Sequence, residues 1–232
     1  MNKNYFIVLK IMVVLYLIVF GSGKPGIAAS PSLYSIDMQY AAEQAAIPEQ
    51  LKADAKTHGV IIAVTEFTDA RQVADKKIIG WVKELDGTKV PVATRAVAQT
   101  RAASNGIKDY LKTAGYQVAD KLVPWDLKEE TMPKGSGKVI IGGSIEDMEI
   151  TCWTGVFSND YKINLKLALV VADSAKGKIL YKGNVTITYS KTDTSFSEGQ
   201  LGRQASLALS DAIVKIFEGK TVAQKIKEAA VK

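Results

Sequence analysis

Residues 138–191 read KVIIGGSIEDMEITCWTGVFSNDYKINLKLALVVADSAKGKILYKGNVTITYSK, and long parts of this stretch alternate between apolar and polar side chains. From Tyr161 to Val171 every second residue is apolar, and polar residues such as Lys162 and Lys166 fall between them. A period of two over this length is typical of a β-strand with one face in a core. The stretch therefore predicts three consecutive antiparallel strands, and it points to no reaction.

A short turn separates the second of these strands from the third. Residues 173–177, DSAKG, end in Gly177, which supplies the positive φ that such turns often need. The chain then returns through Val185-Thr-Ile-Thr-Tyr189, whose β-branched and aromatic side chains suit a pleated sheet. We therefore expect antiparallel pairing across this turn.

Helical periodicity appears in three places. We expect one helix over residues 94–114, with Thr94 as N-cap and Gly115 at the position that ends many helices. A second is expected over residues 197–218 and a short third over residues 222–231, because their apolar side chains lie three or four residues apart. The apolar face of the first helix comprises Ala103, Ile107, Leu111 and Ala114.

Upstream of the first helix, Val60-Ile-Ile-Ala-Val64 is a continuous apolar run that predicts a central strand buried on both faces. Residues 72–92 carry turn signals and predict an irregular excursion with a small hairpin around Asp86-Gly87. A further short strand is expected at residues 116–118. The order of elements indicates an α+β fold, a mainly antiparallel sheet with helices packed on one face.

The first 29 residues have the pattern of an export signal. Lys3 supplies the positive charge, Ile11 to Phe20 is an uninterrupted apolar run, and Gly26-Ile-Ala-Ala29 offers small residues for cleavage. Lys10 interrupts the apolar stretch, and neither side of it reaches the roughly 20 residues that a spanning helix needs. We expect cleavage and a periplasmic protein; the alternative is an uncleaved anchor that keeps the protein at the membrane.

The signal pattern makes a direct prediction about the mature chain. Its first residue is expected to be about Ala29 or Ser30, because the charged, apolar and small-residue regions follow in the order that signal peptidase requires. Intact-mass measurement of the protein from a periplasmic fraction checks this, and a terminus at Met1 would contradict it.

The expected organisation is a signal peptide at residues 1–29, a linker at 30–59, a single α+β domain at 60–220 and a short C-terminal helix at 221–232. Cleavage would leave 203 of the 232 residues, enough for one domain with a substantial core.

The charge of the mature chain is close to balanced. Three of the 30 basic residues precede residue 30, which leaves 27 Lys and Arg against 24 Asp and Glu and a net charge of +3. No basic stripe alternates with aromatic residues, so we expect no nucleic-acid partner. Cys152, the only cysteine, is expected to be a buried, unreactive thiol. The single histidine, His58, gives no basis for a His-rich metal site, and no cofactor is expected.

One set of acidic residues is the best candidate for catalysis. Two carboxylates about 5–10 Å apart would suit glycoside hydrolysis, with a cell-wall or other glycan as substrate. The more ordinary interpretation is a solvated acidic face, with Asp69 and Arg71 forming a surface ion pair worth about 0–1 kcal/mol. The set comprises Glu66, Asp69, Glu146, Asp147 and Glu149.

A loop between the first two long strands is the candidate contact site. It contains Trp153 and Phe157 on either side of Gly155. Aromatic residues are enriched at the centres of interfaces, so these two side chains are predicted to bind a partner. The alternative is that both fold back and cap the end of the sheet.

Several of these stretches together resemble the YajG-like family of bacterial envelope lipoproteins and, more distantly, a wider group that includes transport-auxiliary lipoproteins, CsgG and LpoB. The resemblance covers most of residues 60–218 and rests on folding patterns rather than on one tight motif. The matching pieces are Val60 to Phe67 with Thr68-Asp69-Ala-Arg71 and Ile79-Gly80, Tyr110 to Val118, Val139 to Ile145, the hairpin around Asp173, and the helix from Ala205 to Ile216.

The resemblance implies a non-catalytic accessory or interaction module of the periplasm or cell envelope, and it carries over no catalytic residues. Many members of the family are lipid-anchored through a cysteine after the signal peptide, whereas this sequence has no cysteine there. We therefore expect an envelope protein as partner, and membrane contact only through a retained signal segment. The alternative function is a cell-wall or glycan hydrolase that uses paired carboxylates.

Overall fold

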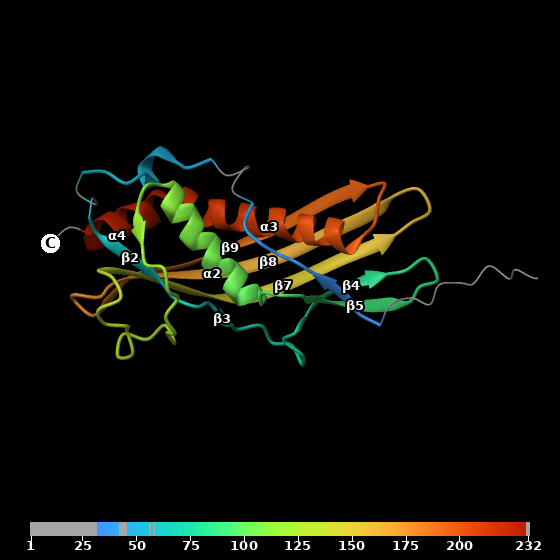
Figure 1. Ribbon diagram of the computed structural model, residues 1–232, viewed down its shortest axis with the longest axis horizontal. Coiled ribbons are helices and arrows are strands. Elements are labelled where there is room, and N and C mark those ends of the chain that lie inside the picture. The colour runs from blue at the N-terminus through green and yellow to red at the C-terminus, as the bar shows by residue number, and fades with distance from the viewer. Residues whose placement is uncertain (1–31, 42–45, 56, 58, 231–232) are drawn as a thin grey trace, which may run out of the picture. The chain divides into compact units, whose positions relative to one another are not determined.

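A 16-residue strand, β7 (Val139–Thr154), lies at the centre of a nine-stranded sheet in the computed structural model, which describes residues 32–41, 46–55, 57 and 59–230. On one side β7 pairs antiparallel with β8 (Asn159–Asp173), and β8 pairs antiparallel with β9 (Lys178–Asp193) (Figure 1). Gly177 has a φ of +64° in the β8–β9 turn, as expected. The three predicted strands are confirmed.

The other side of β7 pairs only with parallel strands. Three short strands follow one another along it: β2 (Ile61–Val64), β3 (Thr68–Asp69) and β4 (Ile78–Lys83). Beyond them, β6 (Gln117–Val118) pairs parallel with β2, and β5 (Lys89–Thr94) pairs antiparallel with β4. The fold is α+β, as expected. The sheet is mixed: the long pairings β7–β8 and β8–β9 are antiparallel, whereas β2, β3 and β4 join β7 in parallel.

The region between β3 and β5 is more regular than expected. Its hairpin around Asp86-Gly87 is confirmed, and it consists of two six-residue strands, β4 and β5. Pairing of Gly80 with Ile150 brings β4 against β7. A Cβ at position 80 would lie 1.9 Å from the carbonyl oxygen of Ile150, so this approach requires glycine.

Part of the segment expected as a linker packs into the domain. β1 (Tyr34–Ile36) pairs parallel with β5, and a 3₁₀ turn, η2 (Glu49–Leu51), buries Leu51. Both elements are three residues long, so neither leaves a periodic pattern that distinguishes it from a linker. Residues 1–29, the predicted signal peptide, lie outside the described residues.

Residues 33–41, called the N-terminal strap below, run along one helix, α3 (Glu198–Glu218). Three side chains of α3, spaced eight and four residues apart, accept hydrogen bonds from the strap's backbone N–H groups. The donors Ser35, Gln39 and Ala41 pair with Glu198, Ser206 and Ser210, at 2.6, 3.1 and 2.8 Å. Three side chains thus satisfy backbone groups that have no strand partner.

The three α-helices of the described residues pack on one face of the sheet (Figure 1). The first, α2 (Gln99–Thr113), begins five residues later than predicted, because Thr94 is the last residue of β5. Its predicted apolar face is buried, and Gly115, with a φ of +92°, follows its end. Ser197 caps α3 by accepting a hydrogen bond from the backbone N–H of Gln200 at 3.0 Å. The last helix is α4 (Lys220–Ala230).

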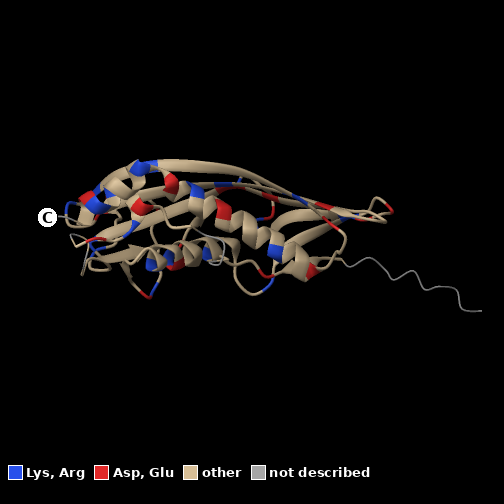
Figure 2. Cartoon of the chain, turned by 90° about the horizontal axis from the view of Figure 1, so that it is seen from above, with Lys and Arg blue, Asp and Glu red and all other residues tan. Residues whose placement is uncertain are grey.

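The core forms where the helices meet alternate residues of β8. Tyr161, Ile163, Leu165, Leu167, Leu169 and Val171 are all buried, which confirms the predicted face. On the opposite face a smaller cluster gathers Trp125 and Met132 against Val170 and Ala172. Charged side chains of both signs are interspersed along the outer surface of the helices (Figure 2).

Candidate contact site at the hairpin end

Two hairpin turns lie side by side at one end of the sheet (Figure 1). One joins β4 to β5 and the other joins β7 to β8. Lys83 of β4 is in register with Trp153 of β7, so both turns begin at the same level. The Thr154 hydroxyl donates to the backbone oxygen of Lys83 at 3.3 Å and joins the two hairpins directly. Residues 83–89 and 153–159 are called the hairpin end below.

The hairpin end carries the most exposed large apolar side chains among the described residues. Phe157 is 88% exposed, Val156 76% and Leu85 67%, while Trp153, one level behind them, is 41% exposed. The alternative in which Phe157 folds back onto the sheet is therefore not what the structure shows. Both side chains lie at the surface, Trp153 at the end of β7 and Phe157 in the turn, and their role in binding stays a prediction.

A polar row crosses the sheet directly behind the turns. Strand register places Lys89, Lys83, Trp153, Asp160 and Thr192 side by side on five strands. The Thr192 hydroxyl donates to Asp160 at 2.7 Å. The arrangement from the tip inward is thus apolar turn, then a row with one tryptophan, two lysines and a carboxylate.

A second tryptophan lies further back on β4. Trp81 is partly exposed, and the ammonium of Lys89 lies 5.9 Å from the centre of its ring, within the range of a cation–π contact. In the register of β4 with β7, Trp81 pairs with Thr151, two residues further from the turn than the pair of Lys83 with Trp153. Both tryptophans therefore belong to the same end of the sheet.

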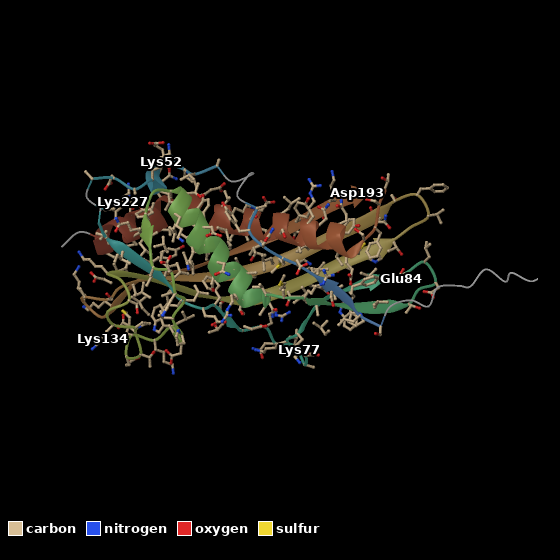
Figure 3. The ribbon with its side chains drawn as sticks, viewed as in Figure 1. Lys52, Lys77, Glu84, Lys134, Asp193 and Lys227 are labelled. Carbon is tan, nitrogen blue, oxygen red and sulfur yellow. The ribbon has the colours of Figure 1, made fainter. Side chains whose placement is uncertain are left out.

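Hydrogen bonds hold the base of the hairpin end. Glu84, at the start of the β4–β5 turn, accepts from the hydroxyl of Tyr34 in the N-terminal strap and from that of Thr154 at 3.4 Å. Burial and, next, the hydrogen bond to Glu84 raise the pKa of Tyr34, so its hydroxyl stays protonated and donates. Asn159 is buried and donates to the backbone oxygen of Asp193 at 3.4 Å. Figure 3 shows Glu84 and Asp193 at this end.

The acidic residues considered for catalysis are dispersed. Glu66 lines a cavity of about 500 Å³ with Trp125 and Asp126, and it pairs with Arg101 at 3.3 Å. Asp147 and Glu149 line a different cavity of about 500 Å³, together with residues of the β3–β4 loop such as Val73 and Asp75. Glu146, in a bulge of β7, pairs with Lys166 at 2.8 Å. The structure thus does not bring Glu66, Glu146 and Asp147 into one cleft.

The expected surface ion pair between Asp69 and Arg71 is buried instead. Arg71 is only 2% exposed and donates to Asp69 at 2.7 Å, to the Lys76 carbonyl at 2.6 Å and to the Ile78 carbonyl at 3.0 Å. Gln99, at the start of α2, also donates to Asp69, at 2.9 Å. Burial alone would raise the pKa of Asp69, but the bonds from Arg71 and Gln99 outweigh it and lower that pKa. The cluster fastens the β3–β4 loop to α2.

Other reactive groups give no site in the described part of the chain. Cys152 is fully buried, as expected, and burial raises the pKa of its thiol to about 12. No three His, Cys, Asp or Glu side chains among the described residues are grouped to hold a metal ion. His58 and the apolar run at 11–20 lie outside those residues, and within them no helix is long and apolar enough to cross a membrane.

Neither a comparison with protein-family models nor a search of curated proteins finds a match to this chain. Among solved structures, protein XCC0632 from Xanthomonas campestris, described by the family model DUF330, superposes with a TM-score of 0.50 at 10% sequence identity. The match covers 84% of this chain and 98% of that one. The chain shares the XCC0632 fold. 

Two other solved structures match at lower TM-scores. One is an uncharacterised protein, with a TM-score of 0.43 at 11% identity over 82% of this chain and 97% of that one. The other is lipoprotein GNA1162 from Neisseria meningitidis, with a TM-score of 0.31 at 14% identity over 66% of this chain and 96% of that one.

Leu85 and Val156 were missed in the sequence. Val156 lies inside the predicted contact loop, between Trp153 and Phe157. Leu85 precedes the predicted Asp86-Gly87 turn, which was a sufficient signal for an exposed position. Its approach to the β7–β8 turn depends on the parallel pairing of β4 with β7, which no local pattern indicates.

Proposed function

We propose that this protein is a non-catalytic accessory module of the bacterial cell envelope, related to the YajG-like proteins, and that it acts by contact through its hairpin end. The observation that carries the proposal is the exposure of Leu85, Val156 and Phe157 on two adjoining turns. Exposed apolar clusters of this kind mark interaction sites more often than isolated surface residues do. The export signal expected at residues 1–29 supports a periplasmic location.

The dispersal of the acidic residues favours contact over catalysis. Glycoside hydrolysis requires two carboxylates on opposite sides of one bond, within about 5–10 Å of each other. Here Glu66 and Asp147 line separate cavities, and Glu146 is neutralised by Lys166. The fold shared with XCC0632 supports the architecture on which the contact site is built, and the function rests on the site itself.

The double variant Trp153→Ala, Phe157→Ala tests this proposal. Both side chains are exposed, so the melting temperature is expected to stay close to that of the wild type, with a stability change within about 0.5 kcal/mol per site. The fraction of protein that co-purifies with the washed cell envelope is expected to fall severalfold. Quantitative immunoblotting of fractionated cells measures it.

The matched control replaces exposed aliphatic residues elsewhere. Ile61→Ala with Val73→Ala alters side chains that are 48% and 45% exposed and lie outside the hairpin end. This control should fractionate like the wild type. If the Trp153/Phe157 variant also does so, the contact site is wrong; if its melting temperature drops strongly, the two residues belong to the core.

A further inference from the structure

The shape of the hairpin end restricts what it can contact. Phe157, Val156 and Leu85 sit at the tips of two separate turns rather than in a groove. A protein partner that covered them would need a matching hollow for each turn, because interface centres pack as densely as protein interiors. A lipid bilayer accepts separate apolar protrusions without such fit, since its acyl chains rearrange around them.

The order of residues behind the tips matches the layers of a membrane interface. The apolar tips come first, and the row with Trp153, Lys83 and Lys89 lies directly behind them. Trp81, two residues before Lys83 in the chain, lies one step further from the tips. Tryptophan prefers the headgroup level of a bilayer, and lysine extends its ammonium toward water from just above it. Residues two apart on a strand, which share a face of the sheet, lie about 7 Å apart along it. This spacing suits shallow insertion of about 5–10 Å.

The charges at this end do not select an anionic surface. The two hairpins and the adjoining row contain Lys83 and Lys89 and, beside them, Glu84, Asp86 and Asp160. Two positive charges against three negative ones leave no net attraction for anionic lipid. Binding would therefore depend on apolar burial and be nearly independent of salt.

The direction of the chain gives an independent argument. β1 runs parallel to β5, with Tyr34 level with Val92, so the described chain begins on the side of the hairpin end. The apolar run Ile11 to Phe20 precedes the first described residue, Ser32, by twelve residues. Twelve residues span at most about 40 Å. A membrane that retained that run would therefore be within about 40 Å of Ser32, at which the described chain begins.

We propose that the hairpin end inserts Leu85, Val156 and Phe157 into the headgroup–acyl boundary of a lipid bilayer. This inference rests on the proposed function and names the surface that the contact site binds. It differs from the sequence-based expectation of an envelope protein as partner, with membrane contact only through a retained signal segment.

Quenching of tryptophan fluorescence by lipid distinguishes membrane contact at the hairpin end from contact through a retained signal segment. The full-length chain is produced in an exporting host, and its N-terminus is determined by mass spectrometry. The purified protein is then titrated with vesicles of phosphatidylcholine brominated on its acyl chains, with and without phosphatidylglycerol, at low and high salt. Bromine quenches a tryptophan that approaches the acyl chains, and residues 1–29 contain none. We expect quenching with both lipid compositions, little change with salt, and loss of most of the signal in Trp153→Tyr.

A matched pair of variants assigns the insertion to the tip. Phe157→Ser should raise the vesicle concentration for half-maximal quenching by about tenfold or more, because burial of one phenylalanine is worth at least that in an equilibrium constant. Ile61→Ser, a change of an exposed side chain on β2, should leave it unchanged. Ile61 precedes the pairing of β2 with the start of β7, about 50 Å from the turn at its other end.

Several results would overturn the proposal. These are an absence of quenching in the wild type, equal effects of the two serine variants, or binding that requires phosphatidylglycerol and disappears at high salt. A photo-crosslinking amino acid at position 157 that captures a protein in cells, while vesicles give no quenching, would replace lipid by a protein partner. The proposed function would still stand in that case, because it fails only if the hairpin-end variant fractionates like the wild type.

Discussion

Arg71→Ala is expected to lower the free energy of unfolding by about 3–5 kcal/mol, the usual cost of removing one partner from a buried ion pair. The substitution leaves the Asp69 carboxylate without its guanidinium and frees the carbonyls of Lys76 and Ile78. The β3–β4 loop loses its attachment at the same time. Urea unfolding followed by circular dichroism measures the change, and the slope of the transition shows whether unfolding stays two-state.

Arg95→Ala is the matched control. Arg95 pairs with two carboxylates, Asp37 at 3.1 Å and Glu198 at 2.7 Å, and donates to the Ser35 carbonyl at 2.7 Å, but its side chain is about half exposed. Exposed pairs contribute about 0–1 kcal/mol, so this variant should lose far less stability. Equal losses in the two variants would mean that burial does not determine the strength of the Asp69–Arg71 pair.

The Asp69–Arg71 pair also makes the stability of the fold depend on pH in the acid range. The pKa of Asp69 in the folded chain lies below its ordinary value. Its contribution to stability is therefore complete above the unfolded pKa of about 3.9 and is lost as the pH falls through the lower, folded pKa. The stability difference between the wild type and Arg71→Ala should be constant near neutrality and narrow below about pH 4.

Leu167→Ala is expected to cost about 2–5 kcal/mol, because truncation of a buried leucine loses apolar burial and leaves a cavity. Leu167 is fully buried and lies between Ile145 of β7 and Val185 of β9 in the sheet, under the helices. Its neighbour Lys166 points to the opposite face and makes a partly exposed pair with Glu146. Lys166→Ala should therefore stay within about 0.5 kcal/mol.

Denaturant midpoints of the two variants, measured side by side, check this contrast. A large loss for Lys166→Ala with a small one for Leu167→Ala would show that the faces of β8 are inverted. Similar losses would mean that both faces of β8 are packed equally well. That would contradict the structure, in which the cluster at Val170 and Ala172 is smaller than the core on the other face.

The elements that could be predicted are those whose signal is local. The two-residue period of β8, the four-residue spacing on α3 and the glycine that ends α2 each act within a few residues of sequence. The mixed character of the sheet could not be predicted, because Gly80 and Ile150 pair across about 70 residues and no single tight turn joins their strands. Parallel neighbours require such long connections, so their pairing leaves no mark near either strand.

The contact site could be predicted only in part for the same reason. Trp153 and Phe157 were recognisable as aromatics beside a glycine in a connecting loop, whereas Leu85 joins them through the register of β4. The burial of Arg71 was missed because a charged residue after a short strand ordinarily lies in solvent. Two of its partners are backbone carbonyls, which every residue possesses and which no sequence pattern identifies.

The N-terminal strap determines how this domain would respond to force. A pull on Ser32 outward, past the hairpin end, acts along β1, whose hydrogen bonds to β5 lie across that direction. All of these bonds, together with those from Ser35, Gln39 and Ala41 to α3, would then be sheared at once instead of opening one after another. A load applied at Ser32 is thus shared between the sheet and α3, so the strap would resist unfolding under force.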